Sequence, residues 1–348
     1  MSRKTGIVRD MRYLEHGAGY SHPESPERLV AIYAMLDEPD MAGLFLPVPV
    51  RPATTDEIAM IHRRSYIAMV ADTAGSAFVS LDPDTATTAG SYAAATLAVG
   101  GLLNAIDKVL AGELDNAFAL VRPPGHHAEA DRAMGFCLFN NVAVGAMHAI
   151  KRHRLERVLI VDWDLHHGNG TQHAFYEDKR VLYFSTHQYP YYPGTGALEE
   201  NGSGAGLGYT INVPLRPGAD NAHYLDVFRR LLQPVALKFK PELILVSAGF
   251  DIYKDDPLGG MGVTPEGFAA LTRVLLNIAD ACCGGRLVMT LEGGYHIHGQ
   301  AAGVKRVLKE MRDDTRTEVV EPSGPPPSDP LIGRVLEQIR AKWDIGNK

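Results

Sequence analysis

The chain has 348 residues, of which 45% are hydrophobic and 22% charged, and its formal net charge is −7. Such a composition is typical of a globular protein that buries a large core. The negative charge argues against a broad nucleic-acid-binding surface, which is normally basic, and mildly favours a cationic ligand.

The cysteines and the N-terminus predict the compartment. Cys137 and the adjacent pair Cys282 and Cys283 match neither a CxxC metal motif nor an even set of disulfides, which favours a reducing cytoplasm. The basic N-terminal residues lack the apolar stretch of a signal peptide, and no run approaches about 18 apolar residues. We therefore expect a cytoplasmic protein with no membrane partner and no nucleic-acid partner.

The first third of the chain predicts two short strands and several helices. Strands are expected over residues 6–10 and 47–50, and helices over 26–36, near 55, over 65–74 and over 91–110. Ser25 followed by Pro26 is a typical start for the first of these helices. The last of them is rich in alanine, and its small side chains suit close packing on a sheet.

Residues 116–121 predict a strand that ends in a chemically rich loop. The loop reads Arg122-Pro123-Pro124-Gly125-His126-His127. Two prolines and a glycine exclude regular structure there, so a stiff turn displays the two histidines. A helix is expected next, over residues 140–151.

Residues 157–172 are the stretch around which the chain is organised. The apolar run 158–161 is typical of a central parallel strand buried on both faces. Asp162, Asp164 and His166 then alternate with apolar residues, so extended backbone would place them on one side. Buried carboxylates require a cation or a hydrogen-bond network. We expect a metal, the alternative being a solvated strand end followed by a helix cap.

The second half of the chain repeats the pattern of strands that end in reactive residues. Strands are expected over 180–186, 209–213, 243–247 and 286–291, with helices over 220–237, 264–280 and 331–343. Asp251 follows the third of these strands and Tyr295 follows the fourth. The proline-rich segment 322–330 predicts a linker. Without a second core, residues 1–348 are expected to form a single catalytic domain, with its core at about 5–310 and a linker and C-terminal helix over 318–348.

Four apolar strands therefore end in loops that carry chemistry. In an open, mostly parallel α/β sheet, ligands bind at the carboxyl ends of the strands, so these loops are expected to converge. Asp164, His166 and Asp251 offer two oxygens and one nitrogen and leave a position open, as in catalytic zinc sites. His127 suits a general base, and Tyr295 suits a donor to an oxyanion. The set predicts metal-assisted hydrolysis of an amide or ester.

Six motifs in this order resemble the zinc-dependent histone deacetylase superfamily, which includes bacterial histone-deacetylase-like amidohydrolases and acetylpolyamine amidohydrolases. They are RPPGHHAE, GFCLFNNVA, VDWDLHHGNGTQ, YPGTG, SAGFD and LEGGY. The resemblance covers about residues 5–310. It implies an arginase-like, three-layer α/β/α sandwich around a central, mostly parallel sheet.

The resemblance implies roles for individual residues. Asp164, His166 and Asp251 match the zinc ligands. The catalytic matches are His127 as general base, His126 as its electrostatic partner, Tyr295 as the carbonyl-polarising tyrosine, and Asp162 and Asn169 as the partners of the two histidines. Asparagine at position 169 is similar to the class II branch and to the bacterial enzymes, whereas class I members carry aspartate.

Substrate and potassium sites are also implied by the resemblance. Gly135, Phe136 and Tyr192 match positions that line an acyl-lysine tunnel. One structural potassium site would involve Asp162, Asp164, His166, Ser185 and Thr186, and a second would involve Phe175, Asp178, Val181 and Tyr209.

Two positions depart from the family pattern. Leu258, a predicted substrate-binding residue, stands where a polyamine-selective branch has a gatekeeping glutamate. Leucine lacks the negative charge that would attract the second ammonium group of a polyamine, which favours acyl-lysine as the substrate. His296 follows the catalytic tyrosine where many members have asparagine.

The expected function is zinc-dependent removal of acetyl or other short acyl groups from N-acyl-lysine side chains. An acetylpolyamine deacetylase is the alternative, and a non-catalytic acyl-lysine reader is a lower one. An arginase-type site fits less well, because it needs more aspartate ligands. Fe(II) competes with zinc for such ligands under reducing conditions. The expected partner is acylated lysine or an acetylated polyamine, and a homo-oligomer is compatible with the sequence.

Overall fold

The central feature of the computed structural model is an eight-stranded parallel sheet. The structure describes residues 2–17, 21–319 and 330–345. The strand order is β2-β1-β5-β10-β9-β6-β7-β8, and a separate antiparallel pair joins β3 to β4. The strands are β1 (Thr5–Val8), β2 (Leu46–Pro47), β3 (Val79–Ser80), β4 (Ala86–Thr87), β5 (Asn116–Ala119), β6 (Val158–Asp162), β7 (Val181–Gln188), β8 (Thr210–Leu215), β9 (Leu243–Ala248) and β10 (Leu287–Leu291).

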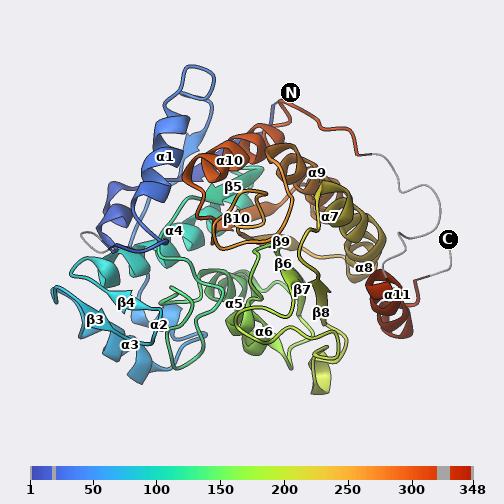
Figure 1. The fold of residues 1–348 in the computed structure, drawn as a ribbon, viewed down its shortest axis with the longest axis horizontal. Coiled ribbons are helices and arrows are strands. Elements are labelled where there is room, and N and C mark those ends of the chain that lie inside the picture. Colours follow the sequence, from blue (N-terminus) through green and yellow to red (C-terminus); the bar gives the residue numbers. More distant parts are fainter. Residues whose placement is uncertain (1, 18–20, 320–329, 346–348) are drawn as a thin grey trace.

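Helices cover both faces of this sheet (Figure 1). They are α1 (Glu27–Leu36), α2 (Thr55–Ile58), α3 (Arg64–Ala71), α4 (Ser91–Leu110), α5 (Asn141–His153), α6 (Asn169–Phe175), α7 (Asn221–Val227), α8 (Gln233–Phe239), α9 (Pro265–Cys283), α10 (Ile297–Met311) and α11 (Pro330–Trp343). Helices α4 and α5 pack together, as do α9, α10 and α1 in a second group. The predicted three-layer α/β/α sandwich is therefore confirmed.

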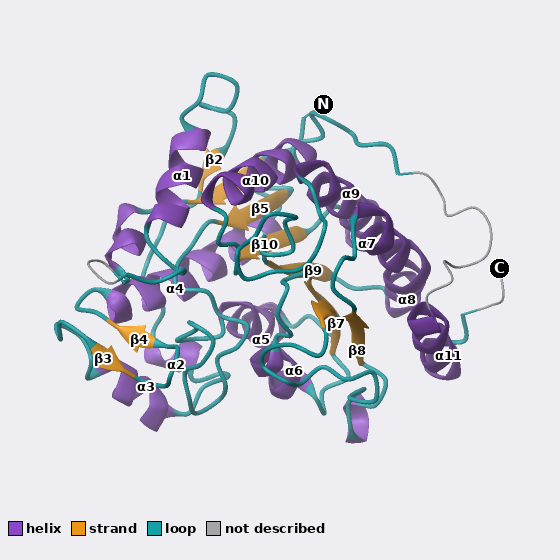
Figure 2. Cartoon of the chain, viewed as in Figure 1, coloured by secondary structure: helices purple, strands orange, loops and turns teal. Residues whose placement is uncertain are grey.

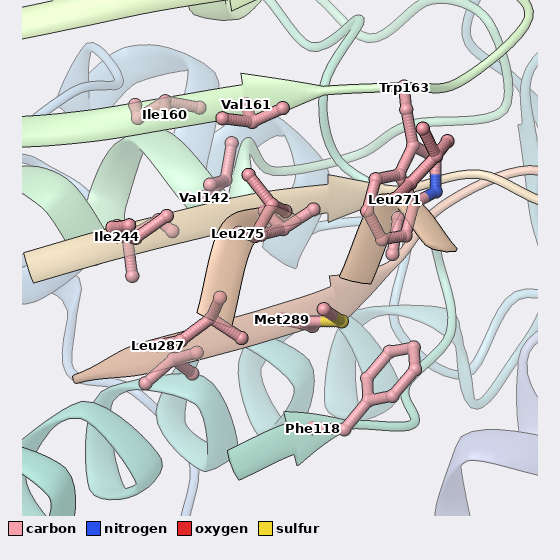
Figure 3. Packing of buried hydrophobic residues seen from close by; sticks show 14 of the residues in the cluster. Phe118, Val142, Ile160, Val161, Trp163, Ile244, Leu271, Leu275, Leu287 and Met289 are labelled. Carbon is pink, nitrogen blue, oxygen red and sulfur yellow. The ribbon is translucent and has the colours of Figure 1, made fainter. Parts of the chain in front are cut away.

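The central strands are buried along their whole length, which explains their uninterrupted apolar sequences. Every residue of β6, β9 and β10 is buried, as expected for parallel strands with helices on both faces. Figure 3 shows side chains of these strands packed against others from α5 and α9, labelled Ile160, Val161, Ile244, Leu287, Met289, Val142, Leu271 and Leu275. This packing holds the strand ends that carry the site.

Helix α4 has the length and apolar composition of a membrane span, and among the described residues it alone does. However, 72% of its apolar window is buried inside the fold. It packs on β1, β5 and α5, which agrees with the predicted core helix (Figure 2).

Three helical segments differ from the sequence-based expectations. The single helix predicted over 220–237 is interrupted by a π-helical turn at Phe228–Leu232. Pro234 accounts for the break, because its ring lacks an N–H and crowds the preceding turn. Helix α10 was not predicted, although Val304, Val307, Leu308 and Met311 form its buried stripe. The first helix begins at Glu27, one residue later than expected.

The C-terminal helix α11 packs against β8 at the edge of the sheet. Its buried side chains, Leu331, Ile332, Val335 and Ile339, belong to the same apolar cluster as the central strands. The predicted linker 322–330 lies outside the described residues except for its last position.

Candidate active site

The four chemically rich strand ends lie side by side. Strands β5, β10, β9 and β6 are consecutive in the sheet, and all are parallel. Their carboxyl ends therefore share one edge, where the loops after them bring the predicted site residues together. Strand β6 itself ends at Asp162, so Asp164 and His166 belong to the loop and reach the site through its turn rather than through strand alternation.

Asp164, His166 and Asp251 form a buried cluster at this edge. Nδ1 of His166 lies 3.2 Å from Oδ1 of Asp164 and 3.1 Å from Oδ2 of Asp251. Zinc bonds of about 2.0 Å in a tetrahedral site place neighbouring ligand atoms about 3.3 Å apart. The spacing and the donor set, one imidazole nitrogen and two carboxylate oxygens, therefore fit a divalent transition-metal ion.

Glycines allow the backbone to approach these carboxylates. A Cβ atom at Gly249 would lie 2.2 Å from Oδ2 of Asp164, and one at Gly293 would lie 2.3 Å from Oδ2 of Asp251. The Gly293 N–H donates to Asp164 at 2.9 Å, and the Leu165 N–H donates to Asp251 at 2.8 Å. The glycines of the SAGFD and LEGGY motifs thus make room for the ligand carboxylates and help to orient them.

The side chains of this cluster change one another's pKa values, some upward and some downward. Burial raises the pKa of Asp251 to about 7, assisted by the neighbouring charge of Asp164. Burial opposes ionisation of Asp164 as well, but His126 and His166 hold its pKa well below the usual value. The two carboxylates also overcome burial to raise the pKa of His166 to about 9. The two carboxylates therefore stabilise a positive charge beside them. A bound cation would supply that charge in place of the His166 proton.

His126 pairs with a carboxylate. Its Nδ1 lies 3.0 Å from Oδ2 of Asp162, which also accepts from the Tyr183 hydroxyl at 3.1 Å. Burial alone would lower the pKa of His126, but Asp162 and Asp164 raise it to about 10. His126 is therefore a positively charged neighbour of the cluster at neutral pH.

His127 pairs with a neutral amide instead. Its Nδ1 lies 2.8 Å from Oδ1 of Asn169, and the Asn169 amide donates to Glu129 at 2.6 Å. Burial and the positive charges of His126 and His166 hold the pKa of His127 well below its usual value. Of the two histidines, His127 is therefore the neutral one that can accept a proton.

Tyr295 is positioned by its backbone. The N–H groups of Tyr295 and His296 both donate to Oδ2 of Asp256, at 2.7 and 3.0 Å. The Arg28 guanidinium lies 5.1 Å from the centre of the Tyr295 ring. Burial raises the pKa of the Tyr295 hydroxyl well above 10, so the group stays protonated and remains a donor.

Aromatic rings surround the histidines. Tyr192 packs edge-on against His127, with centroids 5.1 Å apart, and Phe136 packs edge-on against Tyr295 at 5.9 Å. A Cβ atom at Gly135 would lie 2.3 Å from Cδ2 of His127, and the residue has a φ of +57°, so glycine is required there. Leu258 joins this wall through its carbonyl, which accepts from the Tyr191 hydroxyl at 3.0 Å.

The fold, the motifs and the geometry agree with a comparison to known proteins. The Histone deacetylase domain family matches residues 22–311 of the chain. The chain belongs to the histone deacetylase family. Membership supports a hydrolytic deacetylase function for this chain, and the family is generally metal-dependent, in agreement with the buried ligand cluster.

Proteins similar to this histone deacetylase family member include eukaryotic and archaeal ones. A probable deacetylase of Archaeoglobus fulgidus is 41% identical over 85% of this chain and 82% of its own length. Histone deacetylase HDA1 of Candida albicans is 40% identical over 88% of this chain, and Histone deacetylase 15 of Arabidopsis thaliana is 41% identical over 88%. The chain spans only 41% and 56% of the length of those two proteins. The expected likeness to bacterial enzymes stays a prediction.

A solved structure shows the same fold. The crystal structure of the HDA15 HD domain superposes with a TM-score of 0.91 at 37% identity, covering 99% of this chain and 96% of that chain. The agreement includes the central sheet and therefore the edge at which the site residues meet.

The residues matched to potassium sites of the histone deacetylase family lie beside β7. Asp162 and Ser185 are register partners on β6 and β7, and the buried hydroxyl of Thr186 has no hydrogen-bond partner among the described residues. Phe175, Asp178 and Val181 form the turn that leads into β7. The Tyr209 carbonyl accepts from the Tyr183 N–H at 2.9 Å. Both potassium sites stay predictions.

Several residues that support the site were not assigned a role from the sequence. Asp256 holds the Tyr295 backbone, as described above. Glu292 accepts from the Gly125 and His126 N–H groups at 2.6 and 3.2 Å and from the Ser247 hydroxyl at 2.9 Å. Burial raises the pKa of Glu292 to about 7. A buried acid in LEGGY, directly after an apolar strand, was the available signal.

Proposed function

We propose that this chain is a zinc-dependent amidohydrolase that removes acetyl or other short acyl groups from N-acyl-lysine side chains. One observation carries the proposal: the candidate metal ligands Asp164, His166 and Asp251 lie beside a neutral His127, whose ring centre is 5.9 Å from that of His166, and close enough to a protonated Tyr295 for their charges to act on its hydroxyl. A nucleophilic serine or cysteine is not needed, because water can attack the acyl carbon directly.

A bound zinc ion would polarise the acyl carbonyl and lower the pKa of water at the site. His127 supplies the proton acceptor. Asn169 accepts a hydrogen bond from Nδ1–H of His127, which leaves Nε2 as the basic nitrogen that takes a proton from the attacking water. The positive charge of His126, held by Asp162, stabilises negative charge that develops beside it.

Tyr295 supplies the remaining catalytic group. Its hydroxyl donates to the oxyanion that forms as water attacks the carbonyl carbon. The C–N bond then breaks, and protonated His127 returns its proton to the leaving lysine amine. Tyr192 and Phe136 limit water to the reacting position and suit the methylene chain of a lysine side chain.

One observation favours acetylpolyamines as a second substrate class. Asp84 accepts from the Gly135 N–H at 3.0 Å, and Asp82 accepts from the Asp84 N–H at 2.9 Å. Both carboxylates therefore lie beside the wall of the proposed tunnel, and both side chains are half-buried. Carboxylates at this position would attract a second ammonium group, which a polyamine carries.

The test compares both substrates on one preparation. The protein is stripped of metal and reloaded with zinc, and amine release is measured from an acetyl-lysine peptide and from N8-acetylspermidine, with Tyr295→Phe alongside. A zinc-dependent rate on the peptide that collapses in the variant supports the proposal, and a much higher rate on acetylspermidine selects the second class. Absence of turnover on either compound, with zinc bound, would instead favour an acyl-lysine reader.

A further inference from the structure

Three metal-binding side chains meet outside the candidate active site, between α4 and α5. Oδ1 of Asp107, on α4, lies 2.7 Å from Nε2 of His148 and 2.6 Å from Nε2 of His153, both on α5. The centres of the two imidazole rings are 5.5 Å apart. Both Nε2 atoms are thus directed at a single carboxylate oxygen, so their lone pairs, when deprotonated, point at one place.

The spacing is shorter than in an occupied metal site, and two of the three ligands have room to adjust. Tetrahedral zinc bonds of about 2.0 Å require ligand atoms about 3.3 Å apart, which is about 0.7 Å more than here. The side chains of Asp107 and His153 are 40% and 29% exposed, whereas that of His148 is 6% exposed. His148 therefore provides a fixed ligand, and the other two can move outward to admit an ion.

The surroundings leave room for further ligands. A surface cavity of about 480 Å³ is lined by Asp107 and His148 together with Arg51, Glu57 and Lys151. Burial opposes ionisation of Asp107, but His148 and His153 lower the pKa of its carboxyl to about 2, so the carboxylate is charged at neutral pH. Water or a small anion in the cavity can fill the remaining coordination positions.

We propose that Asp107, His148 and His153 bind a second zinc ion, which joins α4 to α5. Two imidazoles and one carboxylate are ligands that suit zinc, and three protein ligands leave a fourth position open toward the cavity. Because the ligands come from two helices on the same face of the sheet, the bound ion would crosslink α4 and α5. The proposal is independent of the catalytic one, since the two sites share no residue.

Zinc alone is the probe in the experiment. The metal-free chain of 348 residues is titrated with Zn²⁺ in competition with a chromogenic chelator, and bound zinc is counted per chain. We expect two equivalents for the wild type and one for His153→Gln, whose amide keeps a hydrogen bond to Asp107. His223→Gln is the matched control, because His223 pairs at 2.7 Å with a single carboxylate among the described residues, that of Asp220. This variant should retain the wild-type number of zinc equivalents.

Asp107→Asn, which removes the carboxylate ligand, is the second variant and should also lose one zinc equivalent. Circular dichroism checks that each variant is folded. Replacing Zn²⁺ by Co²⁺ adds a spectroscopic readout, because the second equivalent should bring visible absorption bands that His153→Gln lacks. One equivalent in the wild type that His153→Gln retains would overturn the proposal, because that ion would lie outside the α4–α5 cluster. Two equivalents in both His153→Gln and Asp107→Asn would overturn it too, and would place the second ion elsewhere.

Discussion

His127 is held by Asn169, and Asn169 is held in turn by Glu129, which also pairs with His173 at 2.8 Å. The two ends of the Asn169 amide have different partners: its oxygen faces the His127 imidazole, and its nitrogen faces the Glu129 carboxylate. An aspartate at this position would keep the acceptor for His127 but would place a second carboxylate against Glu129. The identity of residue 169 is therefore coupled to that of residue 129.

This coupling gives a prediction for paired variants. Asn169→Asp should lower kcat/KM by about 10-fold to 100-fold, because the residue that orients His127 is displaced by repulsion from Glu129. Adding Glu129→Gln restores a donor opposite the new carboxylate and should recover most of the loss. Steady-state kinetics on the preferred substrate, with Glu129→Gln alone as control, measures both effects. A double variant no better than Asn169→Asp would show that the two residues are not coupled.

Asp256 supports the catalytic tyrosine through the backbone. Its carboxylate accepts from the backbone of Tyr295 and His296, and removal of those bonds should misplace the tyrosine hydroxyl. We expect Asp256→Ala to lower kcat by at least about 10-fold with little change in KM. Asp255→Ala is the matched control, since that neighbouring side chain is 57% exposed. Equal rates for the two variants would remove Asp256 from the support of Tyr295.

At the scale of elements, an ion-pair cluster joins segments that the sheet alone does not hold. The Glu24 carboxylate, just before α1, accepts from Arg28 on α1 at 2.8 Å and from Arg122, in the loop after β5, at 2.5 and 2.7 Å. Arg28 also donates to the carbonyls of Gly294 and Glu292, at 2.6 and 2.5 Å, in the loop after β10. The cluster thus ties α1 to the loops that carry His126 and Tyr295.

The charge of Glu24 makes this contribution dependent on pH. Burial alone would raise the pKa of its carboxyl, but Arg122, His16 and Arg28 hold it well below the usual 4.5. The ionised group therefore stabilises the fold above the unfolded-state pKa, and that stability is lost as the pH falls through the folded-state value. Glu24→Gln should lower the free energy of unfolding at pH 7 by about 3 to 5 kcal/mol.

Denaturant unfolding at neutral and acidic pH measures this effect. The difference between wild type and Glu24→Gln should narrow as the pH falls below 4.5, the usual value for the glutamate carboxyl. Glu38→Gln serves as control, because Glu38 is 48% exposed and pairs with Lys305 at the surface; its cost should stay below about 1 kcal/mol. A loss for Glu24→Gln that does not vary with pH would assign the effect to packing rather than to charge.

At the scale of the whole molecule, one apolar cluster extends from the central sheet to the last helix. Val335 of α11 is fully buried and belongs to the cluster that contains β6, β9 and β10. Helix α11 also covers β8, which ends the strand order and has an open side. Loss of α11 packing should therefore weaken the sheet and expose an edge strand.

Val335→Asp tests this dependence. A buried, unpaired carboxylate should cost about 4 kcal/mol or more and lower the melting temperature of the chain. Arg340→Asp introduces the same residue at an exposed position of α11 and should leave the melting temperature nearly unchanged. Differential scanning calorimetry distinguishes the outcomes, and an unchanged transition in Val335→Asp would mean that α11 does not contribute to the stability of the sheet.

The sequence by itself determined the central strands and the chemistry at their ends. Apolar runs such as 158–161 mark buried parallel strands, because a strand covered on both faces has no polar side. Parallel strands share one carboxyl edge, so the convergence of Asp164, Asp251 and Tyr295 followed from local pattern and one rule of topology. Helix α10 was missed, although its buried stripe was present, and so was the short β3–β4 pair.

Tertiary structure alone decided the partners of those residues. Glu24 and Arg122 are 98 positions apart, and His148 pairs with Asp107 across 41. Such pairs cannot be predicted from local sequence periodicity. A charged residue on a loop or helix face has the same sequence pattern whether its side chain contacts water or another charged side chain. The pKa shifts of His126 and His127 have the same origin: Asp162 and Asp164 raise the pKa of His126, whereas burial and the charges of His126 and His166 lower that of His127.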